Sequence, residues 1–143
     1  MMQQLPRRLP TADAALQHLL RSRTDVPFRW GESDCALWAA DAVHAVTGTD
    51  FAAAMRGRYS TAAQARSLLR PLGGLHGLLA STLRPAPALD LLADGDVALT
   101  QPDGLHRVGA LAVRVRGWVI GQGADGLVMV PRSTVISWWR AFQ

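Results

Sequence analysis

The stretch Trp30-Gly31-Glu32-Ser33-Asp34-Cys35 ends a loop and leads directly into an apolar segment, residues 35–46. As a helix, this segment would be apolar over much of its circumference, and Gly48 follows it as a typical helix end. The pattern therefore predicts a helix from about residue 35 to residue 46. A helix that is apolar on most sides is usually buried, so we expect this one to lie at the centre of its domain.

Helical patterns occupy the chain before residue 84, and short β-rich runs follow residue 95. The predicted helices span residues 12–23, 35–46, 62–70 and 75–83, and residues 84–87 are predicted as an extended connector. The predicted strands span residues 96–99, 108–115, 118–121 and 127–130, and the aromatic tail, residues 137–142, is expected to pack back on the body. Helices first and antiparallel strands second predict an α+β fold.

Length and composition favour a single domain over residues 1–143, with residues 1–10 as an N-terminal arm. Apolar residues make up 49% of the chain and charged residues 18%, which suffices for a core and is too apolar for a disordered chain. No apolar run approaches the roughly 20 residues that span a bilayer. Arg7 and Arg8 have no apolar segment behind them, so we expect neither a membrane span nor a secretory signal.

The distribution of charge argues against a nucleic-acid partner. The formal net charge is +4, and every one of the 15 basic residues is arginine. Together with the abundance of alanine, leucine, glycine and valine, this bias is typical of a GC-rich genome, which accounts for the arginines without a ligand. They are also scattered, whereas a nucleic-acid site needs basic residues clustered on one face with stacking aromatics among them.

Cys35 is the single cysteine, so the chain has no internal disulfide and no cysteine-rich zinc site. We expect neither a metal nor an organic cofactor. Two interpretations of Cys35 are open. Free cysteine often serves as a small buried apolar residue. At a helix start, however, unpaired N–H groups and the helix dipole lower the pKa of a thiol and can stabilise an oxyanion, which makes Cys35 a candidate nucleophile.

Three motifs occur in the order typical of a known family: the stretch that ends in Asp34-Cys35, then Asp94-Gly95-Asp96-Val97, then Arg107-Val108-Gly109-Ala110. The chain resembles the NlpC-type cysteine peptidases, compact papain-like domains that cut peptidoglycan stem peptides. The resemblance implies a papain-like NlpC-type fold, with N-terminal helices packed on a small C-terminal antiparallel sheet. It also implies that Cys35 is the nucleophile at the start of the central helix.

The chain departs from the peptidase pattern at the position of the general base. Where the family places histidine directly before Val-Gly, this chain has Arg107, and His106 lies one residue earlier. On a strand this offset turns a side chain to the opposite face, unless a β-bulge re-aims it. Arginine cannot accept a proton, so catalysis would require His106 as the base. On the following strand, Gln122 is the polar residue able to orient that base.

The expected site therefore has three candidate catalytic residues, Cys35, His106 and Gln122, and three candidate substrate-binding residues, Trp30, Asp34 and Arg107. The remaining histidines do not supply a base, because His44 falls on the far side of the central helix and His18 and His76 have surface-like surroundings.

Several of these side chains also have plain structural interpretations. Asp34 is expected to cap the central helix, and Asp41, two turns later on the same face, to form an ion pair with Arg56 or Arg58. Four tryptophans could line a groove, although aromatic residues in a domain of this size are more often part of the core: Trp30, Trp118, Trp138 and Trp139.

A closer resemblance covers about residues 25–142, to a branch of uncharacterised phage and prophage proteins related to the same superfamily. Short motifs in order carry it: Phe28-Arg29-Trp30-Gly31, Asp34-Cys35, Ala40-Asp41, Thr47-Gly48-Thr49-Asp50, Arg56-Gly57-Arg58-Tyr59, Gly73-Gly74, Gly95-Asp96-Val97, Gly126-Leu127 and Trp139-Arg140. Such proteins resemble tail-tip components of long-tailed phages. The resemblance implies a virion protein that is made in the bacterial cytoplasm and binds other tail-tip and hub proteins.

Three functions stay open on the sequence. The absence of histidine directly before Val108 favours a phage tail-tip or baseplate component whose degenerate cysteine-peptidase domain serves structure and partner docking. The alternative is an active peptidoglycan-cleaving cysteine hydrolase that helps the tail through the cell wall. The third is a soluble bacterial acyl-transfer enzyme with no phage connection.

Overall fold

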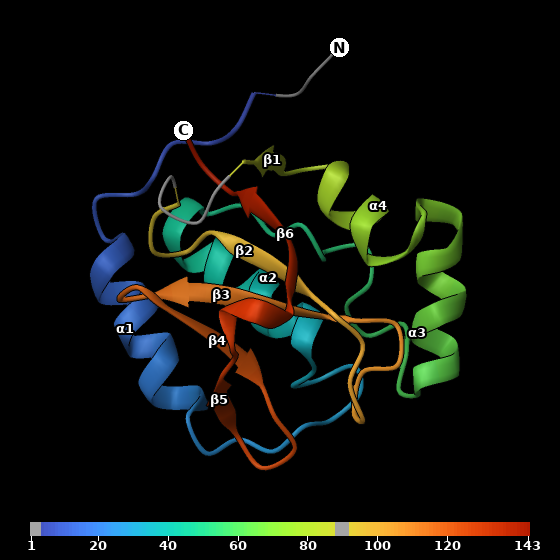
Figure 1. The fold of residues 1–143 in the computed structure, drawn as a ribbon. Helices are drawn as coiled ribbons and strands as arrows, with labels where there is room; N and C mark the ends of the chain where they lie inside the picture. The colour runs from blue at the N-terminus through green and yellow to red at the C-terminus, as the bar shows by residue number, and fades with distance from the viewer. Residues whose placement is uncertain (1–3, 88–91) are drawn as a thin grey trace.

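The computed structural model describes residues 4–87 and 92–143, so the first three residues of the expected N-terminal arm lie outside the described residues. The helices among them are α1 (Ala12–Arg23), α2 (Cys35–Thr47), α3 (Ala62–Leu69) and α4 (Gly74–Ala80), with two short 3-10 turns, η1 (Arg70–Leu72) and η3 (Arg132–Thr134). The strands are β1 (Arg84–Ala86), β2 (Val97–Thr100), β3 (Ala110–Val115), β4 (Trp118–Gln122), β5 (Leu127–Met129) and β6 (Val135–Arg140). The predicted α+β class is confirmed (Figure 1).

The described strands form one antiparallel sheet in the order β1-β6-β2-β3-β4-β5. The tail that was expected only to pack back is strand β6, and it lies between the edge strand β1 and β2. The extended connector before the strands is itself the edge strand β1, which pairs with β6. A sheet edge tolerates Pro85 because the missing N–H of proline breaks no ladder there.

Helix α2 is the centre of the fold, as predicted. It lies behind the sheet in Figure 1, with α1 on one side and α3 and α4 on the other. Ten of its 13 residues are buried, and the fully buried Trp38 donates its indole N–H to the carbonyl of Ile120 in β4 at 2.9 Å. The helix begins at Cys35, and Gly48 ends it in the left-handed region, at a φ of +80°.

The start of α2 is fixed by Asp34, which caps the helix as expected. Its carboxylate accepts the N–H of Leu37 at 2.9 Å and the N–H of Gly31 at 2.8 Å. It also accepts the hydroxyl of Tyr59, from the loop that precedes α3. Because Asp34 is only 1% exposed, these hydrogen bonds are shielded from water, and they fix the backbone on which Cys35 is presented.

Asp41 forms the expected ion pair with Arg56 and a second one with Arg23, which ties α1 and the loop at 51–59 to α2. Arg56 also binds Asp50. Burial raises the pKa of the Asp50 carboxyl, but the hydrogen bonds from Arg56 and from the backbone of Ala52 outweigh it and lower the pKa overall. The network keeps this loop against the middle and the C-terminal end of α2.

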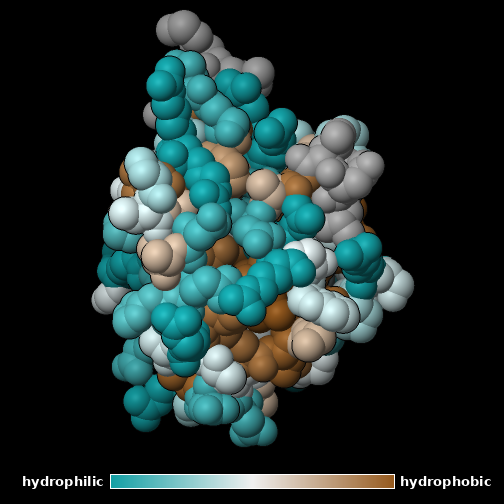
Figure 2. Space-filling view, turned by 90° about the vertical axis from the view of Figure 1, so that its left-hand side faces the viewer, coloured by the Kyte–Doolittle hydropathy of each residue, from teal (hydrophilic) through white to brown (hydrophobic). Residues whose placement is uncertain are grey.

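The tryptophans divide between core and surface. Trp139 is buried at 2% exposure and Trp118 is 59% exposed, so the expectation that these residues form core holds for the first and is wrong for the second. Trp30 and Trp138 are half-buried. Seen from the α1 side, the surface is largely polar around an apolar hollow in its lower half (Figure 2).

Two glycines with the same backbone conformation allow a matched test of how tightly the Cys35 loop is packed. Gly31 has a φ of +81°, and a Cβ there would lie 2.0 Å from the Tyr59 carbonyl oxygen. Gly57 has a φ of +74° with nothing within 4 Å. We expect Gly57→Ala to cost about 1 kcal/mol of unfolding free energy from the left-handed backbone alone, and Gly31→Ala about 2 kcal/mol more from the clash. Urea unfolding of both variants measures this, and equal losses would contradict it.

Candidate functional site

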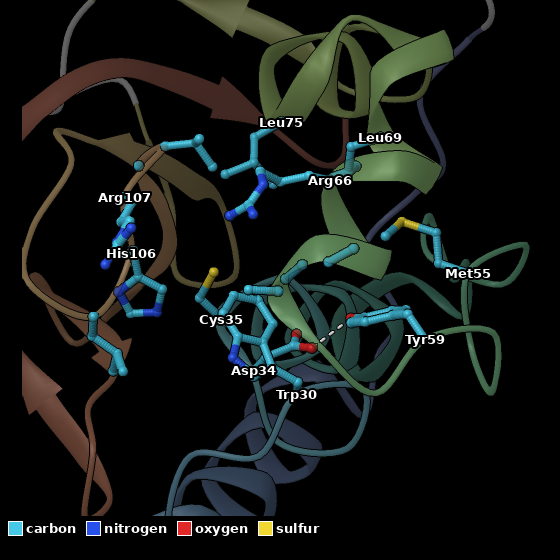
Figure 3. Close-up of a pocket in the computed structure, with 16 residues that line it drawn as sticks. Trp30, Asp34, Cys35, Met55, Tyr59, Arg66, Leu69, Leu75, His106 and Arg107 are labelled. Carbon is cyan, nitrogen blue, oxygen red and sulfur yellow. Dashed lines mark hydrogen bonds between the residues drawn. The ribbon is translucent and has the colours of Figure 1, made fainter.

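A cavity of about 310 Å³ opens at the start of α2, between the loop at 51–59, α3 and the loop at 105–109 (Figure 3). Its lining combines apolar side chains with a few polar ones: Trp30, Asp34, Cys35, Ala36, Met55, Tyr59, Ala62, Ala65, Arg66, Leu69, Leu75, Leu105, His106, Arg107, Val108 and Gly109. Five of the six candidate site residues are therefore brought together at one cavity, and Gln122 is the exception. We refer to this cavity of about 310 Å³ as the Cys35 cavity.

His106 reaches the Cys35 cavity because it does not lie on a strand. Strand β3 begins at Ala110, two residues later than predicted, and residues 101–109 form a loop that ends with Gly109 at a φ of +98°. The alternation of strand faces therefore does not apply to His106, and no bulge is needed to re-aim it. In Figure 3 its ring is drawn beside Cys35 on the wall of the cavity.

The two ring nitrogens of His106 have different surroundings. Nδ1 lies 3.3 Å from one carboxylate oxygen of Asp103 and 3.4 Å from the other. Nε2 is buried and has no hydrogen-bond partner among the described residues. A carboxylate on Nδ1 favours the tautomer that carries its proton there and leaves Nε2 as an acceptor. The ring is 5% exposed and packs edge-on against Phe28, with 5.4 Å between ring centroids.

Asp103 is the site residue that sequence reasoning missed. Its Oδ1 also accepts the backbone N–H groups of Leu105 at 2.8 Å and His106 at 2.6 Å. Partial burial raises the pKa of Asp103, but these hydrogen bonds and that of the His106 ring outweigh it and lower the pKa, so Asp103 is a carboxylate at neutral pH. The turn Pro102-Asp103-Gly104, three residues before a histidine, was the available signal.

Gln122, the expected orienting residue, lies at the end of β4 and is 2% exposed. Its side-chain amide donates to the carbonyls of Val26 at 2.8 Å and Gly123 at 3.0 Å, and its Oε1 has no partner among the described residues. It lines a second cavity of about 440 Å³ on the other side of the loop at 101–109, which His106 and Asp103 line as well. The hydrogen bond to Val26 therefore ties Gln122 to the loop that precedes Cys35.

The Cys35 sulfur lies in a protected position between α2 and β3. The residue is 5% exposed, and burial raises the pKa of its thiol to about 12. Backbone hydrogen bonds from Leu111 and Ala36 act against this rise, while the negative charges of Asp34 and Asp103 add to it. The expectation of a thiol pKa lowered by the helix start is therefore wrong for the resting protein, because desolvation and two nearby carboxylates outweigh the dipole.

The raised thiol pKa predicts how fast Cys35 reacts with a small alkylating reagent. Only the thiolate reacts, so the rate should be low at neutral pH and rise about tenfold per pH unit through the alkaline range. Because Cys35 is the single cysteine, mass spectrometry of iodoacetamide-treated protein follows it directly. A rate already on a plateau at neutral pH would show that the thiol is activated in the resting state.

None of the helices in residues 4–87 and 92–143 has the length and apolar character needed to cross a bilayer. The same residues contain no cluster of three or more His, Cys, Asp or Glu side chains that could hold a metal ion.

The model of the family described as Domain of unknown function (DUF6950) matches residues 7–141, nearly the whole chain. No curated protein and no solved structure matches the chain.

Proposed function

The chain belongs to the DUF6950 family, and because that family's description assigns no activity, we propose from the site that it is a cysteine-dependent hydrolase of acyl–nitrogen bonds. In this proposal Cys35 is the nucleophile, His106 the general base and acid, and Asp103 the residue that orients His106. The fold is proposed to be a papain-like domain of the NlpC type, with peptidoglycan stem peptides as the substrate.

One observation carries the proposal: a cysteine and a histidine line the same cavity, and the histidine has a carboxylate on one nitrogen and a buried, unpartnered second nitrogen. A buried polar atom without a partner costs free energy. A reacting group that hydrogen-bonds to Nε2 would remove that cost. Nucleophile, base and orienting group in one place are the arrangement that activates a weak nucleophile.

The chemistry follows from these positions. His106 Nε2 takes the proton of the Cys35 thiol as the sulfur attacks the acyl carbon, which forms a tetrahedral oxyanion. The oxyanion collapses, the carbon–nitrogen bond breaks, and the His106 proton goes to the departing amine, which leaves a thioester on Cys35. Water then gives a proton to His106 and attacks the thioester. Collapse of the second oxyanion releases a carboxylic acid and returns the proton to the sulfur.

The start of α2 supports stabilisation of the oxyanion. The first N–H groups of a helix have no carbonyl partner within it. Asp34 accepts the N–H of Leu37 and the Asp34 carbonyl accepts that of Trp38, whereas the Cys35 N–H stands at the first position of the helix, next to the sulfur. A backbone donor at that place can bind the negative oxygen that develops beside the nucleophile.

Because burial raises the pKa of the resting thiol, the proposed mechanism has His106 take the thiol proton during attack on the acyl carbon rather than before it. Substrate that fills the Cys35 cavity would also keep water away from the reacting groups, which strengthens the hydrogen bonds among them. The proposal therefore requires a bound substrate before the thiol becomes reactive.

The test is digestion of purified peptidoglycan and of its soluble peptide fragments with the full chain, followed by mass spectrometry of the products. The proposal expects a new amine and a new carboxylate in equal amounts, and no products with Cys35→Ala. Trapping of the thioester on Cys35 by rapid acid quench would identify the intermediate. Products that form equally with Cys35→Ala, or none with any peptide, would contradict the proposal.

The second candidate function is favoured by the burial and raised pKa of the Cys35 thiol. Here the domain is a degenerate relative of the peptidases that serves as a phage tail-tip or baseplate component and docks hub proteins in the virion. It expects no hydrolysis and a stable complex with neighbouring tail proteins. Two results together would favour this second function. The natural chain would hydrolyse no peptide, and the Cys35→Ala variant would still co-purify with the neighbouring tail proteins.

A further inference from the structure

Two arginines face the Cys35 cavity without an acidic partner. Arg66 reaches into it from α3, and Arg107 lies on the loop wall next to His106 (Figure 3). Among the described residues, neither guanidinium has a hydrogen bond, ion pair or ring contact. Both side chains belong to exposed residues and are therefore charged and accessible to a ligand.

The lining of this cavity does not neutralise the two charges. Its single acidic side chain is Asp34, which is buried and whose oxygens already accept the N–H groups of Gly31 and Leu37 and the Tyr59 hydroxyl. The guanidinium groups of Arg66 and Arg107 outnumber this single carboxylate, and a partly enclosed cavity focuses their electric field toward an anionic ligand. The Cys35 cavity therefore offers two guanidinium groups without an acidic partner among the described residues to an anionic group of a ligand.

The positive lining continues beyond Cys35. A third cavity, of about 500 Å³, shares Arg66, Leu69, Leu75 and Val108 with the Cys35 cavity. Its other lining residues include Arg70 and His76 and no acidic side chain. The two cavities together form a groove, which we call the basic groove, whose shared apolar floor suits an extended chain rather than a small isolated acid.

We propose that Arg66 and Arg107 bind a carboxylate of the acyl substrate, so that the site selects acidic peptides that lie in the basic groove. This inference rests on the proposed function for its reaction, and on the groove itself for its ligand. Guanidinium groups bind carboxylates through two parallel hydrogen bonds, which fixes orientation as well as charge. A carboxylate held by both arginines would place the neighbouring acyl carbon at Cys35.

Arg66 is the part of this arrangement that the sequence did not indicate. At the start of its helix the Thr61 hydroxyl accepts the N–H of Gln64 and the Gln64 side chain accepts the N–H of Ser60, and nothing in that segment points to a ligand. Its role follows from the packing of α3 beside the start of α2, which brings residues 66 and 107 to the same cavity.

The experiment measures binding apart from catalysis, with the full-length Cys35→Ala variant. Two blocked tripeptides that differ only in a central glutamate or glutamine are titrated by calorimetry at low ionic strength. We expect the glutamate peptide to bind about tenfold more tightly, and Arg66→Gln or Arg107→Gln to remove about threefold to fivefold of that preference each. The preference should shrink as salt is added.

Arg21→Gln is the matched control, since it removes the same charge from an exposed position on α1. Equal binding of the two peptides, or an equal effect of Arg21→Gln, would overturn the inference. Displacement of the glutamate peptide by an equal concentration of inorganic phosphate would also overturn the inference, because it would indicate a general anion site. A preference for glutamate without any hydrolysis by the natural chain would support the groove and contradict the proposed reaction.

Discussion

Replacing His106 with alanine is expected to lower kcat/KM for the hydrolysed peptide about 10³-fold, because it removes the group that takes and returns every proton in the cycle. With a resting thiol pKa of about 12, almost no thiolate is present at neutral pH without a base. Steady-state assays on the peptide identified by product analysis measure the loss. The effect should appear mainly in kcat, since the imidazole is proposed to act in proton transfer rather than in substrate binding.

Two controls separate catalysis from a structural role. His44→Ala removes an exposed histidine on the far side of the same helix as Cys35 and should leave the rate unchanged. Free imidazole should restore part of the activity of His106→Ala, because the removed ring leaves space next to the Cys35 cavity. Full activity of a folded His106→Ala variant would contradict the assignment of the base.

The same assay shows whether Asp103 or Gln122 orients His106. Asp103→Asn should lower kcat about tenfold, less than the loss of the imidazole itself, because Asp103 is half exposed and water can replace part of its hydrogen bond. Gln122→Ala is expected to affect stability first, through its two backbone hydrogen bonds. A larger loss of kcat in Gln122→Ala than in Asp103→Asn would instead show that Gln122 orients His106, as predicted from the sequence.

Local patterns predicted the parts of the fold that local forces determine. The start and end of α2 follow from the capping aspartate and from Gly48, and Thr61 and Gln64 mark the beginning of α3 in the same way. These signals depend on residues within one or two turns. The position of Cys35 at the helix start was predicted correctly for that reason.

Features that depend on distant residues could not be predicted from those patterns. The tail forms strand β6 because it pairs with β1 on one side and β2 on the other, and the paired residues lie 35 to 56 positions apart in the chain. Its aromatic residues gave no sign of that partner. The thiol pKa likewise depends on burial by β3 and on the charge of Asp103, and neither is visible in the sequence around Cys35.

The histidine offset shows how a correct rule can be applied to the wrong element. The rule that successive residues on a strand face opposite sides is sound, but it was applied to His106, which precedes β3. Gly109, at a φ of +98°, turns the chain just before β3 begins, so His106 belongs to the preceding loop. Asp103 organises this loop by accepting the N–H groups of Leu105 and His106, and its contact with the His106 ring depends on that loop structure rather than on a strand pattern.

The largest effect on stability is expected at Asp34. Asp34→Ala removes the cap of α2, worth about 1 kcal/mol, and leaves the buried Tyr59 hydroxyl and the Gly31 N–H without their acceptor, worth about 1–3 kcal/mol. We expect a total loss of about 3 kcal/mol of unfolding free energy, measured by urea denaturation. Asp34→Asn should lose less, since its amide oxygen can still accept the Leu37 N–H.

A double-mutant cycle with Tyr59→Phe tests whether the loss arises from this contact. If it does, the double variant should be more stable than the sum of the two single losses predicts, because no orphaned hydroxyl remains.

Burial, and then the hydrogen bond to Asp34, raise the pKa of Tyr59, so the stability that this side chain contributes is present below about pH 10 and lost as the pH rises further. Tyr59 is the single tyrosine, so tyrosinate absorbance follows its titration directly. In Asp34→Ala the pKa should fall toward its usual value. Strict additivity together with an unchanged titration would show that Asp34 stabilises α2 without the help of Tyr59.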